Sequence, residues 1–258
     1  MGEARRRRRT FDAMLVDEPA CIYCGGEATS IEHMPPIILF DNRDRPRGLE
    51  FSACEHCNAG TRLTDQVIAM LCRSLCDRDG ARTAPDSAKI MLAVANNDPK
   101  TLLELQPTEE QIARTRGLIN GGPINIGPRM QAHMRVFLGK LGMSLFRHVS
   151  GVRLSNEGAV RAAWYSNYQA LTQSIPPATW SDLPPFEVLT QGKKTSNGQF
   201  EYSWSVSDTE RLFRFVAVFR FSFMADILVA TDRMLLDDMP RPDSEVRPGE
   251  LLKHVPRL

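Results

Sequence analysis

The spacing of hydrophobic residues changes from helical in the middle of the chain to alternating in its last third. Apolar side chains recur at i, i+4 and i+7 from Met130 to Leu145, and this spacing predicts a long amphipathic helix that ends near Gly151. Thr108 and Gln111 have the spacing of a capping box, which opens another helix. Shorter helices are predicted over residues 63–76, 87–95, 99–105, 108–117 and 157–171.

Alternating runs near the C-terminus predict an antiparallel sheet. Every second residue of 200–206 is aromatic or aliphatic, and the alternation resumes over 213–223, which predicts one long second strand. Shorter strands over 186–189 and 227–230 complete a meander. An aromatic face of this kind can stack nucleic-acid bases. Burial against the preceding helices already explains the alternation, and we favour it.

The N-terminal quarter has the pattern of a β-hairpin followed by a helix. Residues 30–33 can form a first strand, which Pro35 and Pro36 end, and residues 48–52 can form the return strand. A helix then begins after Cys54. With 258 residues and 42% hydrophobic content, the chain can bury a substantial core.

We therefore expect an α+β protein with an N-terminal finger, a helical middle and a C-terminal antiparallel meander. The predicted segments are a flexible basic N-terminal arm (1–17), the finger (18–80), a helical region (81–175), a sheet packed on the helices (176–237) and a poorly ordered Pro-rich tail (238–258).

Four of the six cysteines form two CxxC pairs, Cys21/Cys24 and Cys54/Cys57. Each pair lets two thiolates reach one ion without straining the backbone, so the four match a tetrahedral, structural Zn²⁺ site. The gap between the pairs is longer than in a minimal zinc module, which leaves room for the predicted hairpin.

The segments CIYC, IEHMPP and ACEHCN together resemble the HNH endonucleases over roughly residues 18–66. The resemblance implies a zinc-stapled ββα-metal finger. In that family the histidine beside the acid is the general base, while the acid and the residue after the last cysteine hold a catalytic divalent ion. The resemblance therefore implies that His33 is the base and that Glu32 and Asn58 bind Mg²⁺ or Mn²⁺.

The residue types suit phosphodiester hydrolysis. Imidazole has an unperturbed pKa near neutrality, as a base that activates water requires, and a divalent ion on oxygen ligands offsets the charge that develops on phosphate. Successive strand side chains point to opposite faces, so Glu32 and His33 require a bent hairpin or an open groove. The family also has a bracing asparagine where this chain has Leu49, and Asn42 is a candidate substitute.

Arginines near the motif are candidate phosphate contacts. Arg62 lies four residues after Asn58 on the same helical face and can clamp a phosphate with two hydrogen bonds. Arg43, Arg45 and Arg47 lie in the hairpin loop. The chain carries a net charge of only +1, so the basic run Arg5–Arg9 is a local feature. It is either a DNA-contacting arm or a solvated tail.

We expect endonucleolytic hydrolysis of DNA that leaves 5′-phosphate and 3′-hydroxyl ends, in a restriction or phage-defence setting. One finger holds one active site, so double-strand cleavage requires a homodimer or two nicks. The alternative is a non-catalytic zinc finger that binds nucleic acid or protein, alone or within a larger assembly.

The two remaining cysteines, Cys72 and Cys76, are spaced i, i+4 on an apolar run, which favours buried core thiols over a second metal site.

Two further observations concern the location of the protein. Cysteines in metal-type spacing and no N-terminal apolar segment argue for a reducing compartment, by default the cytoplasm. Charged residues interrupt the longest apolar stretch, 213–230, so no membrane contact is expected.

Overall fold

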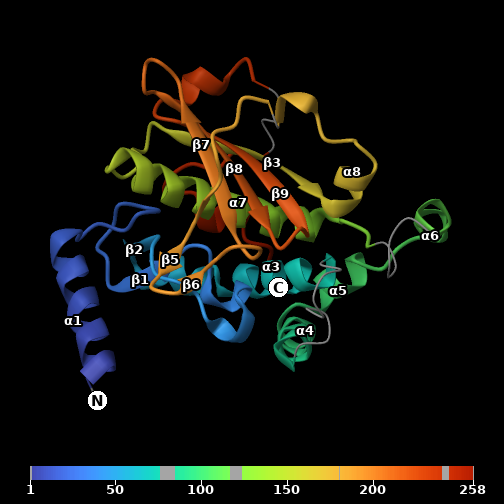
Figure 1. Cartoon of the computed structure of the whole chain (residues 1–258), viewed down its shortest axis with the longest axis horizontal. Coiled ribbons are helices and arrows are strands. Elements are labelled where there is room, and N and C mark those ends of the chain that lie inside the picture. Colours follow the sequence, from blue (N-terminus) through green and yellow to red (C-terminus); the bar gives the residue numbers. More distant parts are fainter. Residues whose placement is uncertain (1, 76–84, 117–123, 180, 240–243, 258) are drawn as a thin grey trace.

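The N-terminal segment is helical. The structure, a computed structural model, describes residues 2–75, 85–116, 124–179, 181–239 and 244–257, and Figure 1 labels its elements. Helix α1 (Gly2–Asp17) occupies the segment that we expected to be a flexible arm. Its sequence contains five arginines and two alanines, which are good helix formers. Phe11, Met14 and Leu15 are half-buried on the side that contacts the hairpin, which explains the docking of this helix.

The predicted hairpin is present. Strand β1 (Ser30–His33) pairs antiparallel with β2 (Glu50–Ala53). The return strand begins two residues later than predicted, because Gly48 and Leu49 have left-handed backbone angles, φ +111° and +58°. The 3-10 turns η1 (Ile37–Leu39) and η2 (Asp41–Arg43) lie in the connecting loop.

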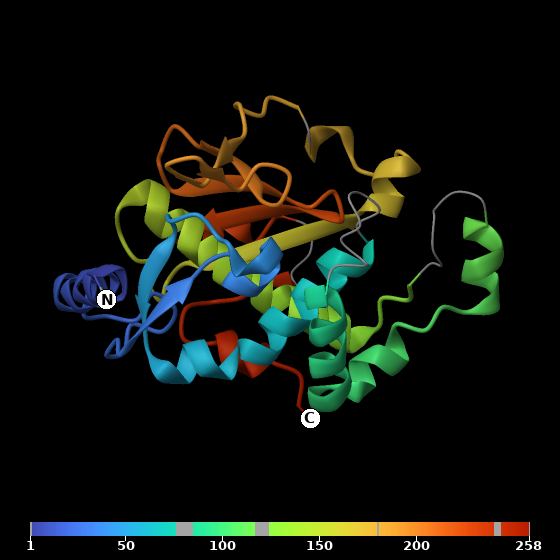
Figure 2. The same ribbon diagram turned by 60° about the horizontal axis from the view of Figure 1, so that its bottom comes forward.

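Helices form the middle of the chain. They are α2 (Glu55–Gly60), α3 (Arg62–Leu75), α4 (Pro85–Asn97), α5 (Pro99–Glu104), α6 (Glu109–Thr115) and α7 (Pro128–Ser150). The predicted capping box is confirmed, because the side chains of Thr108 and Gln111 each bond the other residue's backbone N–H. Gly151 ends α7 in the left-handed conformation, φ +76°. Helices α1 and α6 project from opposite ends of the molecule (Figure 2).

The C-terminal third contains the expected antiparallel sheet. The strand order is β3-β9-β8-β7-β4, and all neighbours are antiparallel. The strands are β3 (Ala159–Ser166), β4 (Glu187–Val188), β7 (Glu201–Val206), β8 (Leu212–Phe219) and β9 (Phe223–Ala230). A separate hairpin joins β5 (Thr190–Gln191) to β6 (Lys194–Thr195). The aromatic face is buried as expected, with Phe215 and Phe219 both 0% exposed.

Two predictions in this region were wrong. Most of the helix expected over residues 157–171 is strand β3, and only α8 (Asn167–Leu171) is helical. Pairing with β9 along the whole of β3 outweighs the helix propensity of its alanines. The single strand expected over 213–223 is divided between β8 and β9 by a turn. Arg220 and Phe221 have positive φ there, and Arg220 forms an ion pair with Asp41 of the finger loop at 2.7 Å.

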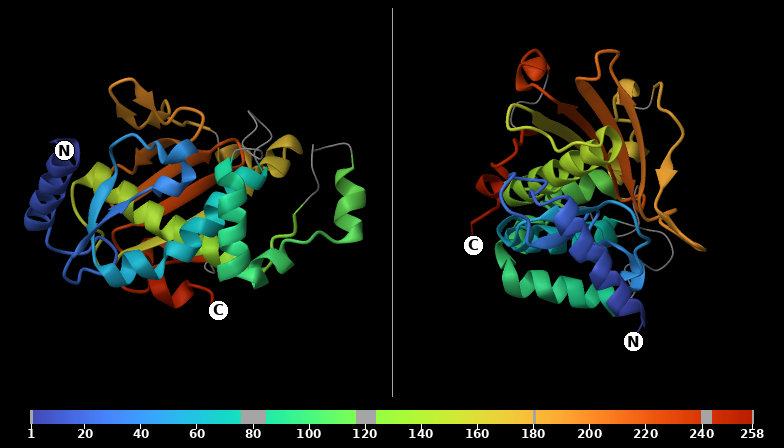
Figure 3. Two further views of the ribbon diagram at one scale, coloured as in Figure 1. Left: turned by 90° about the horizontal axis from the view of Figure 1, so that it is seen from below. Right: turned by 90° about the vertical axis from the view of Figure 1, so that its left-hand side faces the viewer.

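Helix α7 lies between the finger and the sheet (Figures 1 and 3). It contacts α3 on one side and β3, β8 and β9 on the other. Gly142 permits this closeness, because a Cβ atom there would lie 2.6 Å from the Val160 side chain. One hydrophobic cluster includes Cys21 of the finger, Phe137 of α7 and Phe215 of the sheet. The finger, helices and sheet therefore share a core.

The C-terminal segment packs on this core, so the prediction of a poorly ordered tail was wrong for residues 244–257. Val246 is 1% exposed and exchanges two backbone hydrogen bonds with Val160. Leu251, also 1% exposed, belongs to η6 (Leu251–His254), which contacts α7 and α2. Short 3-10 turns also occur at η3 (Pro177–Thr179) and η4 (Arg233–Leu236). None of the helices in the described ranges has the length and apolar character that a membrane crossing requires.

Candidate functional site

The two CxxC pairs come together as one cluster. The sulfur atoms of Cys21, Cys24, Cys54 and Cys57 all lie within 4.8 Å of one another, and those of Cys24 and Cys54 are 3.7 Å apart. Tetrahedral zinc with Zn–S bonds of about 2.3 Å separates its sulfurs by about 3.8 Å. Among the described residues this is the one cluster of His, Cys, Asp or Glu close enough to hold a metal ion. The four cysteines can therefore hold one ion such as zinc.

Local backbone structure prepares the cluster. Gly25 has φ +75°, which turns the chain directly after Cys24, and the Cys57 N–H donates to the Cys54 sulfur at 3.3 Å. The neighbouring Cys57 thiol lowers the pKa of Cys21 to about 4, and the same contact raises the pKa of Cys57. Four thiols this close suit a cation, since metal binding removes their protons.

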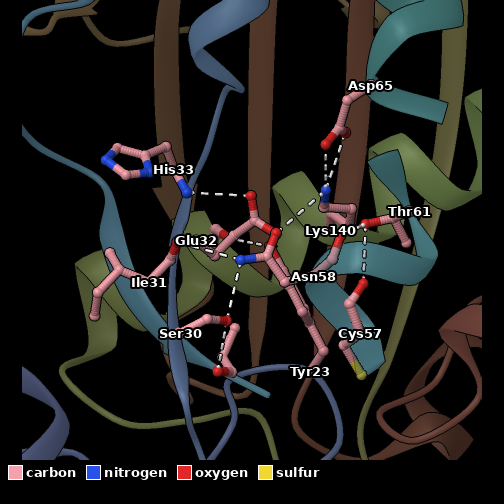
Figure 4. A network of polar contacts seen from close by, with 12 residues as sticks. Tyr23, Ser30, Ile31, Glu32, His33, Cys57, Asn58, Thr61, Asp65 and Lys140 are labelled. Carbon is pink, nitrogen blue, oxygen red and sulfur yellow. Dashed lines mark hydrogen bonds and ion pairs between the residues drawn. The ribbon is translucent and has the colours of Figure 1, made fainter. Parts of the chain in front are cut away.

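The hairpin directs Glu32 and His33 to opposite sides of β1 (Figure 4). The Glu32 side chain is 4% exposed and points toward α7. The half-buried His33 ring contacts Phe11 of α1 edge-on, with ring centroids 5.8 Å apart. This follows from the two-residue period of a strand and agrees with the prediction that both side chains cannot point inward.

Glu32 belongs to a buried charge network that the motif does not reveal. The Lys140 Nζ atom, 0% exposed on α7, lies 2.9 and 3.1 Å from the two carboxylate oxygens of Asp65 and 3.3 Å from Glu32 Oε2 (Figure 4). Glu32 Oε1 accepts the His33 backbone N–H at 3.1 Å, whereas Oε2 is buried without a hydrogen-bond partner. Lysine therefore holds Asp65 closely and Glu32 loosely.

The network contains two acids and one ammonium group. Burial raises the pKa of Glu32 to about 7, against the attraction of Lys140 and with a further rise from Asp65. Burial also raises the pKa of Asp65, which Lys140 opposes. Burial disfavours the charge on Lys140, but the two carboxylates outweigh it and leave the Lys140 pKa above its ordinary value. With all three groups ionised, one negative charge stays uncompensated.

Asn58 braces the hairpin from α2. Its Nδ2 atom donates to Ser30 Oγ at 3.1 Å and to the Ile31 carbonyl at 3.3 Å. Asn58 therefore supplies a bracing amide, a role for which Asn42 was the candidate from the sequence. Through these bonds, α2 fixes the strand that carries Glu32 and His33.

An open pocket of about 300 Å³ joins these groups. Its polar lining includes Glu32, His33, Asn58, Arg43, Arg62, Asp65 and Gln66, and its apolar lining comes from β1 and η1. The three residues that the motif nominated for catalysis all line this pocket, although the side chains of Glu32 and His33 leave opposite faces of β1. The pocket also has two arginines at its edge, a composition that suits an anionic ligand.

Of the four candidate phosphate-binding arginines, three are exposed and one has a buried side chain. Arg62 and Arg43 line the pocket, and the Arg62 side chain is 68% exposed beside Glu55. Arg47 is exposed in the loop. Arg45 is buried, with a side chain 2% exposed, and it donates to the carbonyls of Pro35, Pro46, Met34, Gly48 and Leu49 and to Glu50. The assignment of Arg45 to nucleic acid is corrected: this side chain folds the loop.

Sequence reasoning missed Asp65 and Lys140. Asp65 lies seven residues after Asn58, a spacing of two helical turns in the sequence, although a break at Thr61 places Asn58 on α2 and Asp65 on α3. Lys140 interrupts the apolar stripe of α7 between Phe137 and Leu141. A lysine at a core position requires a partner, although the stripe does not say which one.

The structure also places two further candidates from the sequence, Cys72 and the Arg5–Arg9 run. Cys72 is a fully buried thiol, as expected, while Cys76 lies outside the described residues. The Arg5–Arg9 run is part of helix α1.

No protein-family model, no curated protein and no solved structure matches this chain.

Proposed function

We propose that the protein is a metal-dependent endonuclease that hydrolyses DNA phosphodiester bonds with the chemistry of an HNH finger. One observation carries the proposal: His33, Glu32 and Asn58 line a single open pocket, and Asn58 directly follows Cys57 of the four-cysteine cluster in the chain. The cysteine cluster can stabilise the finger, while the polar pocket beside the hairpin stays open for the substrate.

The cysteine cluster suits Zn²⁺, because four thiolates at tetrahedral spacing are its preferred structural ligands. For a catalytic Mg²⁺ or Mn²⁺, the relevant observation is the buried Glu32 Oε2, which pairs with the Lys140 ammonium at 3.3 Å and has no hydrogen-bond donor among the described residues. This oxygen and the Asn58 side chain are the residues that would hold the ion. When bound, a divalent ion supplies charge stabilisation for the phosphate and the leaving oxygen.

The protein groups have separate roles. His33, half-buried on the side of β1 opposite Glu32, accepts the proton of the attacking water. The Phe11 ring, whose centroid lies 5.8 Å from that of the His33 ring, restricts the imidazole. Asn58 fixes the strand that carries His33. Arg62 and Arg43, at the pocket edge, hold phosphate oxygens of the strand. One finger then cuts one strand, so nicking is the expected product of a monomer.

The test is the conversion of supercoiled plasmid to nicked circles by zinc-loaded protein with Mg²⁺ or Mn²⁺. His33→Ala should abolish nicking, whereas His56→Ala, an exposed histidine between Cys54 and Cys57, should retain it. Equal nicking by both variants, or nicking that survives EDTA, would refute the proposal.

A second candidate function is a non-catalytic finger that binds nucleic acid. Lys140 favours it, because this ammonium already lies 3.3 Å from the carboxylate that would hold the divalent ion. DNA retention in a gel-shift assay that is unchanged by EDTA, without strand scission, would support this alternative over the nuclease.

A further inference from the structure

Lys140 connects the rest of the protein to the finger, because it pairs with Glu32 and Asp65 from outside the finger. It belongs to α7, the helix between finger and sheet (Figure 1). Its side chain extends from the apolar stripe toward Asp65 and Glu32 (Figure 4). An ammonium group with 0% exposure is held there only by its ion partners.

The two partners of Lys140 are unequal. Asp65 receives hydrogen bonds to both carboxylate oxygens, at 2.9 and 3.1 Å. Glu32 is 3.3 Å away, and its Oε2 atom has no hydrogen bond from lysine or any other donor in the described part of the chain. Of the two carboxylates, Glu32 is the one that can exchange its cation.

A divalent ion at Glu32 would meet the lysine charge at close range. Two positive centres a few ångströms apart repel strongly inside a protein, where the effective dielectric constant is well below that of water. The same ammonium attracts the carboxylate that the ion needs. Lysine and a divalent ion therefore compete for Glu32.

We propose that Lys140 is a built-in competitor of the divalent ion and sets the concentration at which the site loads. The inference rests on the proposed function, since the ion in question is the one assigned to Glu32. Asp65 moderates the competition by holding the ammonium group on its own side. Metal loading is thereby coupled to the packing of α7 against the finger.

The experiment measures Mn²⁺ binding to the zinc-loaded protein by electron paramagnetic resonance and calorimetry. Asp65→Asn frees Lys140 for Glu32 and should weaken Mn²⁺ binding. The double variant Asp65→Asn/Lys140→Met removes the competitor and leaves no unpaired charge at position 65. It should bind Mn²⁺ at least about tenfold more tightly than Asp65→Asn.

Two controls locate and qualify the effect. Glu32→Gln should abolish the Mn²⁺ signal in both backgrounds. The double variant Arg161→Met/Glu245→Gln neutralises another buried ion pair, 2.6 Å long and outside the finger, and should leave Mn²⁺ affinity unchanged. Zinc content and far-ultraviolet circular dichroism establish that each variant is folded.

Equal Mn²⁺ affinity in Asp65→Asn and in the double variant would overturn the inference, as would Mn²⁺ binding that survives Glu32→Gln. These outcomes are distinct from failure of the proposed function, because plasmid nicking that depends on His33 can persist when Mn²⁺ affinity does not respond to Lys140. Conversely, a lysine-dependent Mn²⁺ site without nicking would support the inference and refute the nuclease.

Discussion

The cysteine cluster and the Glu32–Lys140–Asp65 network are both polar groups inside the finger, yet they obtain their positive charge differently. The cysteines offer four sulfurs and no cation, so any ion that binds them comes from solution. The network contains its own cation, delivered by a helix 75 positions after Asp65. One centre can therefore take its cation from solution, whereas the other is already partly neutralised by Lys140 of α7.

Removal of the external ion is the strongest way to test this comparison. Structural zinc sites contribute about 10–16 kcal/mol of apparent binding free energy at pH 7, so chelation or Cys57→Ser should unfold the finger. Metal content by mass spectrometry and the amide NMR spectrum would report the loss. Cys72→Ala, which alters a buried thiol outside the cluster, should keep the metal. A finger that stays folded without metal would contradict the Cys₄ assignment.

Removal of the internal cation should have the next largest effect. Lys140→Met leaves two buried carboxylates without their partner, and loss of one member of a buried ion pair costs about 3–5 kcal/mol. Urea denaturation would measure this decrease in the free energy of unfolding. Asp65→Asn/Lys140→Met should recover part of it, because the closest pair is then neutral. A single variant as stable as the unmodified protein would show that the network is not a source of stability.

The pH dependence of stability separates the two centres further. Glu32 binds its proton more tightly in the folded state, where its pKa is about 7 against an ordinary value of 4.5. Its contribution is therefore fully present below about pH 4.5 and is lost as the pH rises to about 7, a change of about 3 kcal/mol. Asp65, whose pKa is also raised, acts in the same direction.

The measurement is the free energy of unfolding of the unmodified protein and of Glu32→Gln between pH 4.5 and 7. The cysteines contribute equally to both proteins, so the difference between the two curves isolates Glu32. Parallel curves would show that Glu32 is ionised throughout this range, with Lys140 as a full partner.

The range of the contacts also explains what sequence analysis could predict. Spacing encodes geometry when partners lie in one local unit, so the CxxC pairs, the hairpin and the capping box at Thr108 were predictable. Strand β3 was not, because its alanines favour a helix until β9 lies beside them. Local propensity decides the secondary structure of a segment only where no tertiary pairing overrides it.

The arginines of the loop illustrate the same limit within a single segment. Arg43, Arg45 and Arg47 are equivalent in sequence, yet Arg45 is enclosed by carbonyl groups while Arg43 borders the pocket. Charge and spacing identify a basic loop. They do not identify which arginine the folded loop uses for itself, because that depends on how the backbone turns around it.

Asn58 lies between the two centres, one residue after the last cysteine of the cluster, and its replacement should have the smallest effect. Asn58→Ala removes two hydrogen bonds to β1, which together contribute about 1–2 kcal/mol. Asn97→Ala is a matched control, because its exposed amide bonds only the Gln66 side chain and should change stability by less than about 0.5 kcal/mol. Zinc content should stay unchanged in both variants, since neither residue is a ligand of the cluster. A loss of zinc in Asn58→Ala would show instead that the hairpin brace and the cysteine cluster form one cooperative unit, and the contrast between the two centres would then hold for their ions but not for their folding.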